Sequence, residues 1–143
     1  MDTTYVRFSG QEKQLLRETI RQLALSGVEV VGNPGQASAI LSIDRSTVRR
    51  DVLSTDRRGR AQEYAINVSI RFRLVGQEGN DLFGPEEVSS QAVLALDPSN
   101  PTANRSELEN TVASLQADAV SRMLRLVSSA EVSRPLEESI PEE

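Results

Sequence analysis

A strict alternation of apolar and polar residues runs through the middle of the chain. Every even position from Tyr64 to Leu74 is apolar, and the odd positions between them are Ala65, Asn67, Ser69, Arg71 and Arg73. Successive side chains of a β-strand point to opposite faces, so this pattern predicts a strand with one face in the core and the other in water. Such strands are typical of antiparallel sheets. The fold must therefore contain a sheet that is covered on one face only.

Further strands are expected on both sides of this one. A short strand is predicted over residues 4–8, a longer one over about 39–54, and a third long strand over about 88–96. Residues 56–59 have the sequence Asp-Arg-Arg-Gly, which is turn chemistry, and Gly59 can adopt a positive φ there. We therefore expect a hairpin whose tip is this turn.

Two amphipathic helices are predicted. The first follows Ser9-Gly10-Gln11-Glu12, which has the form of a capping box, and its apolar stripe extends to about Ser26. Gly27 stands where a left-handed residue commonly ends a helix. The second helix is expected to start within residues 102–106 and carries an apolar stripe over 108–126.

The order of these elements predicts an α+β fold. Each helix has one apolar stripe and the best-defined strand has one apolar face, so we expect a two-layer sandwich. Two helices would pack on one face of a four-stranded, mostly antiparallel sheet. We expect this single domain to cover residues 1–130, because residues 131–143 are acidic, contain proline and are poor in apolar residues. That last segment is predicted to be a disordered tail.

The residue types in the chain exclude several kinds of active site. There is no cysteine and no histidine among the 143 residues, which removes disulfides, thiolate metal sites, cysteine nucleophiles and the commonest general base. Neither common phosphate-binding loop motif occurs. Neighbouring carboxylates such as Glu86 and Glu87 are expected to be solvated surface. We therefore expect no catalytic residues, no metal site and no cofactor.

Positive charge is concentrated in one segment of an acidic chain. The net charge is −5, yet residues 45–73 carry eight arginines and three acidic residues. Guanidinium groups bind phosphate or carboxylate in a bidentate manner, and Arg57, Arg58 and Arg60 surround the predicted turn. The alternative is a solvated sheet edge on which Asp44, Asp51 and Asp56 pair with arginines. The acidic balance and the five aromatic residues argue against a nucleic-acid partner.

The hairpin over residues 53–74 resembles the signature region of the LptE family. The similar pattern is a polar strand, a basic turn with glycine, and then G-x-x-x-E-Y, here Gly59-Arg60-Ala61-Gln62-Glu63-Tyr64. Two further stretches agree, LALSGVEVV at 23–31 and SRMLRLV at 121–127, the latter ending a helix that follows a loop with Asp-Pro. The resemblance covers about residues 3–128.

The resemblance implies a non-catalytic role in lipopolysaccharide transport and assembly. LptE proteins are lipoproteins of the Gram-negative outer membrane that plug the LptD β-barrel, assist its assembly and bind lipopolysaccharide. The family's basic turn position corresponds to Arg57, with Arg58 and Arg60 beside it, and a second basic position falls on Asn104, next to Arg105. We therefore expect Arg57, Arg58, Arg60 and Arg105 to contact lipopolysaccharide phosphates.

The family's members carry a signal peptide and a lipidated cysteine ahead of the first strand. The chain begins with Met1 directly before that strand, so we expect it to be the soluble part of a lipid-anchored outer-membrane protein on the periplasmic side. A cytoplasmic anion- or RNA-binding α+β module is the alternative. An enzyme that uses carboxylates alone is a third possibility.

Overall fold

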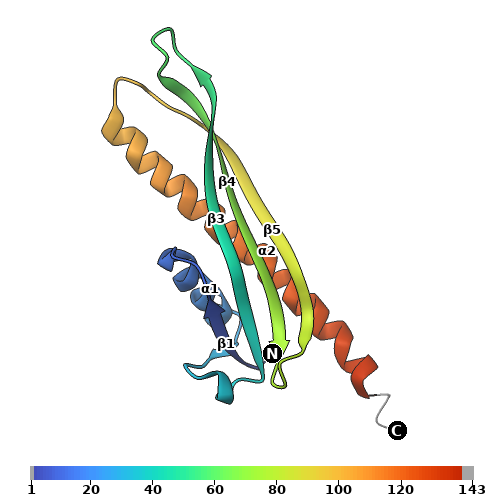
Figure 1. Ribbon diagram of the computed structural model, residues 1–143. Helices are drawn as coiled ribbons and strands as arrows, with labels where there is room; N and C mark the ends of the chain where they lie inside the picture. The colour runs from blue at the N-terminus through green and yellow to red at the C-terminus, as the bar shows by residue number, and fades with distance from the viewer. Residues whose placement is uncertain (1, 140–143) are drawn as a thin grey trace.

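The computed structural model describes residues 2–139, with side chains described up to residue 130. A strand and a helix open the chain, three long strands follow one another in its middle, and one long helix comes last (Figure 1). In chain order they are β1 (Thr3–Phe8), α1 (Lys13–Leu25), β2 (Glu29–Val30), a short 3-10 turn (Pro34–Gln36), β3 (Ala39–Thr55), β4 (Ala61–Gly76), β5 (Asp81–Ala95) and α2 (Pro101–Ser139).

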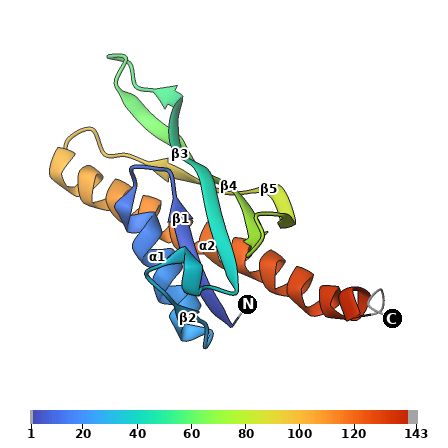
Figure 2. The same ribbon diagram turned by 60° about the horizontal axis from the view of Figure 1, so that its bottom comes forward.

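The strands form one mixed sheet in the order β2-β1-β3-β4-β5. Strand β1 runs parallel to β2 and to β3, while β3, β4 and β5 form an antiparallel meander. Both helices lie on one face of the sheet and the other face is open (Figures 1 and 2). Helix α1 packs beside β1 and β2, and α2 crosses β4 and β5. The structure thus confirms a two-layer α+β fold with two helices on one sheet face.

The number of strands differs from the prediction of four. The fifth strand is β2, which pairs with β1 through only two residues, Glu29 opposite Thr3 and Val30 opposite Thr4. It forms because Gly27 ends α1 with φ 87° and the N–H of Val28 bonds the carbonyl of Leu23 at 3.0 Å. This cap returns the chain to the edge of β1, and the sheet is five-stranded and mixed.

The central strand β4 shows the face alternation that the sequence predicts. Its side chains at Ile66, Val68, Ile70, Phe72 and Leu74 are at most 1% exposed and pack in the core beneath the helices. Strand β5 begins at Asp81, seven residues before the predicted start at residue 88. The prediction failed there because Gly84 and Pro85 interrupt the pattern, yet β5 is an edge strand, where a proline without an N–H is tolerated.

A bulge in β3 changes which residues face the helices. Ile43 pairs with Phe72 and Arg45 pairs with Arg71, so Asp44 is an extra residue in β3. Before the bulge the odd residues of β3 face the core; after it the even residues do. The arginines and threonine at positions 45, 47 and 49 therefore lie on the open face of the sheet.

Both helices begin differently from the prediction. Glu12 precedes α1 without capping it, and its carboxylate accepts a hydrogen bond from the hydroxyl of Ser46 on β3. The predicted capping box is therefore wrong, because a side chain on the sheet occupies this carboxylate. Helix α2 starts at Pro101, before the predicted residues 102–106, and Asn100 Oδ1 accepts the N–H of Ala103 at 3.2 Å.

Helix α2 extends to Ser139, beyond residue 130, the predicted end of the domain. The predicted acidic tail covers residues 131–143; no side chain of 131–139 is described, and 140–143 lie outside the described residues. The boundary and the disorder of the tail therefore stay predictions. Within the described part of the chain, neither helix has the length and apolar character needed to cross a membrane.

Candidate functional site

The predicted turn forms the tip of the hairpin between β3 and β4. The N–H of Asp56 donates to the carbonyl of Arg60 at 2.8 Å, and the N–H of Gly59 donates to the carbonyl of Asp56 at 3.0 Å. Gly59 has φ 80°, as the sequence predicted. The hairpin projects beyond both helices (Figures 1 and 2). The turn therefore presents its side chains at one end of the molecule.

The carboxylate of Asp56 holds this turn together. Its Oδ1 accepts the backbone N–H groups of Arg58 at 2.9 Å and Arg60 at 2.8 Å, and its Oδ2 accepts Nε of Arg60 at 2.8 Å. The backbone N–H of Arg60 does most to hold the pKa of Asp56 below its usual value, aided by the Arg60 side chain and the Arg58 N–H. Asp56 is therefore a turn-forming residue as well as a counter-ion.

The tip retains positive charge after this pairing. Arg57 and Arg58 are exposed, and no ion pair joins either of them to another described residue. Arg60 is exposed as well, although Asp56 holds its Nε atom. The structure therefore brings together three of the four arginines expected to contact phosphates, and two of these keep an unpaired guanidinium.

Arg105 lies on a separate element. It is exposed in the second turn of α2, whose first residues lie at the same end of the molecule as the hairpin tip (Figure 1). No described hydrogen bond or ion pair links it to the tip. The neighbouring Asn104, which the resemblance places at the family's second basic position, accepts the N–H of Asp97 at 3.0 Å and donates to its carbonyl at 2.6 Å. Asn104 thus closes the loop before α2.

Three further carboxylates, those of Asp44, Asp51 and Asp81, also have arginine partners. Arg73 lies 2.9 Å from Asp44 and 3.1 Å from Asp81, and Asp44, followed by Asp81, raises the pKa of Arg73. Arg49 lies 3.4 Å from Asp51. Ion pairs of the kind that the alternative expects are therefore present at Arg49, Arg60 and Arg73. The alternative does not describe the two unpaired arginines of the tip.

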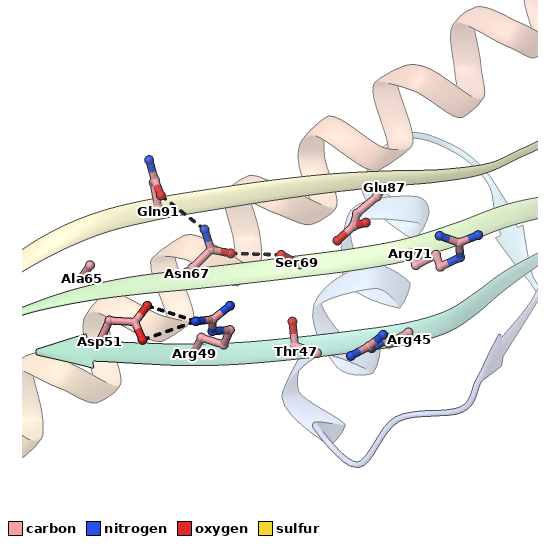
Figure 3. Close-up of a pocket in the computed structure, with 10 residues that line it drawn as sticks. All are labelled: Arg45, Thr47, Arg49, Asp51, Ala65, Asn67, Ser69, Arg71, Glu87 and Gln91. Atoms are coloured by element: carbon pink, nitrogen blue, oxygen red, sulfur yellow. Dashed lines mark hydrogen bonds and ion pairs between the residues drawn. The ribbon is translucent and has the colours of Figure 1, made fainter.

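A polar groove of about 360 Å³ lies on the open face of β3, β4 and β5 (Figure 3). It combines arginine, carboxylate, hydroxyl and amide side chains from all three strands. Its lining residues are Arg45, Thr47, Arg49, Asp51, Ala65, Asn67, Ser69, Arg71, Glu87 and Gln91. This groove was not predicted from the sequence, because the bulge at Asp44 decides which residues of β3 reach it.

The described side chains include groups that could hold an anion. Among the side chains described, those of residues 2–130, no three of the metal-ligating types are grouped closely enough to hold an ion. The chemical features that the structure does present are guanidinium groups, at the hairpin tip and in the groove. These suit the binding of anions.

The fold is that of several bacterial lipoproteins. The solution structure of an uncharacterized lipoprotein B from Nitrosomonas europaea superposes with a TM-score of 0.79 at 22% identity, over 92% of this chain and 85% of that one. Rare lipoprotein B from Shewanella oneidensis superposes with a TM-score of 0.77 at 22% identity, over 93% of this chain and 98% of that one. A minor lipoprotein from Acinetobacter baumannii gives 0.76 at 15% identity, over 91% and 92%.

The family model described as LptE, lipopolysaccharide-assembly, matches residues 1–127. The chain belongs to the LptE family. It is therefore a lipopolysaccharide-assembly protein, and its family is a non-enzymatic one. No curated protein sequence matches the chain significantly.

Proposed function

We propose that the chain is a non-catalytic subunit that plugs an LptD barrel, assists assembly of that barrel and binds lipopolysaccharide. Membership of the LptE family supports this role. It also counts against the alternatives of a cytoplasmic RNA-binding module and of a carboxylate enzyme. The binding proposal rests on one observation: Arg57 and Arg58 at the projecting tip have no ion-pair partner among the described residues.

Lipopolysaccharide binding is assigned to the tip. The guanidinium groups of Arg57 and Arg58 are exposed and have no counter-ion among the described residues, whereas Arg60 shares Asp56. Phosphates of lipid A and the inner core would supply that counter-ion, and a hydrogen bond to a charged group contributes about 1.5–3 kcal/mol. Arg57 and Arg58 are therefore the main contacts, with Arg60 held in place by Asp56 and Arg105 as a contact from α2.

We propose that the open sheet face is the surface that contacts the barrel lumen. Its outward positions in β4 and β5 include Asn67, Ser69, Ser89 and Gln91, all polar. The interior of an outer-membrane barrel is polar as well, so such a face suits a lumenal plug. We further propose that a lipid anchor ahead of residue 1 holds the natural protein at the periplasmic side of the outer membrane. Three proteins of the same fold are named as lipoproteins.

Lipopolysaccharide binding by charge-reversal variants tests this proposal. Arg57→Asp should weaken binding about tenfold, and Arg57→Asp/Arg58→Asp/Arg60→Asp should abolish it, since two or more charged contacts of about 1.5–3 kcal/mol are replaced by repulsion. Binding by the wild type should also fall as salt is raised. The matched control is Arg17→Asp, which makes the same charge change at an exposed position of α1.

Circular dichroism would confirm that each variant is folded. Equal binding by the folded triple variant and the wild type would contradict the assignment. So would equal losses for Arg57→Asp and the control Arg17→Asp, because binding would then follow total charge alone.

A further inference from the structure

Two arginines on neighbouring strands lie side by side in the groove of the open sheet face. Arg45 on β3 and Arg71 on β4 are direct partners in the strand register. Side chains of such partners project from the same face, with Cβ atoms about 4.5–5.5 Å apart, and like charges placed there destabilise a sheet. Neither guanidinium has an ion pair with another described residue. In Figure 3 the two guanidinium groups extend in opposite directions along the strands, and rotation about the side-chain bonds would bring both onto one anion, which would offset their mutual repulsion.

The bulge at Asp44 creates this pair. Without the extra residue, the alternation set by Leu41 and Ile43 would turn Arg45 toward the core. With it, Arg45 joins Arg71 on the open face, while Asp44 itself bonds Arg73. The local carboxylate is therefore used by another arginine and does not neutralise the pair.

We propose that Arg45 and Arg71 form a binding site for a phosphate group. A phosphate monoester carries about −1.5 to −2 charges and three acceptor oxygens, which matches two guanidinium groups better than a single carboxylate does. The groove volume of about 360 Å³ lies in the range of small-ligand sites, about 300–1,000 Å³. This site is separate from the hairpin tip, so it does not depend on the proposed lipopolysaccharide contacts there. It shares the open face with the proposed lumenal surface, so a phosphate bound in the complex would lie at that interface.

The rest of the groove can bind the sugar to which that phosphate is attached. Next along the sheet is the partner pair Thr47 and Ser69, and Ser69 donates to Asn67 at 3.0 Å. Asn67 in turn donates to Gln91 at 3.3 Å, so a row of hydroxyl and amide groups leads away from the arginines (Figure 3). Hydroxyls and amides both donate and accept hydrogen bonds, as the hydroxyl groups of a sugar require.

Glu87 opposes the proposed ligand. It is the register partner of Arg71 on β5, yet no ion pair joins the two, and in Figure 3 the carboxylate and the guanidinium point away from each other along the strands. A nearby negative charge weakens anion binding. Replacing it should therefore strengthen the site, which gives a variant that is expected to gain function.

Titration of the full chain with glucose 6-phosphate, followed by amide NMR shifts, tests the proposal. We expect saturable shifts at residues 45–49 and 67–71, a loss of at least about tenfold in affinity for Arg71→Gln, and tighter binding for Glu87→Gln, because two charge-assisted contacts hold the phosphate. Inorganic phosphate and glucose are the other probes. Equal binding of inorganic phosphate would assign the free ion as ligand, tighter binding of the ester would assign a phosphorylated sugar, and glucose should cause no shifts.

The tip variant Arg57→Ala/Arg58→Ala is the control and should bind the phosphates as the wild type does. Shifts confined to residues 56–60, or affinity that is lost in the tip variant and kept in Arg71→Gln, would overturn the proposal. Thermal unfolding adds a second test: phosphate should raise the Tm of the wild type but not that of Arg71→Gln. Equal stabilisation of both proteins would also overturn it.

Discussion

Arg60 Nε lies 2.8 Å from Asp56 Oδ2, within a turn whose backbone N–H groups bind the same carboxylate. The pair closes the hairpin tip and uses the only carboxylate of the turn. Arg57 and Arg58, between the two partners in sequence, are left exposed without an ion pair in the described chain. One ion pair thus fixes the shape of the tip and leaves its positive charge available to a ligand.

The titration of Asp56 tests this relationship. Its pKa should lie below the ordinary value, and Arg60→Ala should restore only part of the difference, because the backbone N–H groups of Arg60 and Arg58 remain. Since the folded pKa is the lower one, Asp56 stabilises the fold above its unfolded pKa of about 4, and this is lost as the pH falls through the folded value. Side-chain carboxyl NMR would follow the titration, with Arg57→Ala as control. A larger change in the control than in Arg60→Ala would contradict the geometry.

The core is predicted to depend on the covered face of β4. Ile70 is 0% exposed, so Ile70→Ala should lower the free energy of unfolding by about 2–5 kcal/mol. Val93 on the neighbouring strand β5 is 62% exposed, and Val93→Ala should change the free energy of unfolding by no more than about 0.5 kcal/mol. Urea unfolding of the two variants compares a covered and an open position, and similar losses would show that the open face is not solvated.

The acidic segment 131–143 is predicted to contribute little to stability. Its apolar residues are few, so ordering it would cost more conformational entropy than burial could offset. A chain that ends at residue 130 should therefore melt at nearly the same temperature as the full chain. A greater loss of Tm on this deletion than for Ile70→Ala would place the domain boundary beyond residue 130.

The sequence predicted the features that depend on local pattern. The alternation in 64–74 revealed which side of β4 is covered, and Asp56 to Gly59 marked the hairpin tip, because both signals lie within one continuous segment. The same applies to Gly27 at the end of α1. These features need no knowledge of the distant chain.

Features that depend on pairing between distant segments were not predictable. Strand β2 exists because the end of α1 returns Glu29 and Val30 to the edge of β1, and two residues carry no periodicity. The extra residue Asp44 moves Arg45 to the open face, and only the pairing of β3 with β4 reveals it. The register partner of Arg45, and with it the groove, therefore became visible only in the folded chain.

Formation of a complex with the barrel tests the central claim most directly. The lipid-anchored protein would be co-expressed with its cognate LptD, and the complex purified in detergent by size-exclusion chromatography with light scattering. We expect a stable complex with one copy of each protein, and a monomer when this chain is expressed alone. Separate elution of the two proteins, with the anchor present and this chain folded, would contradict the proposed role as a barrel plug.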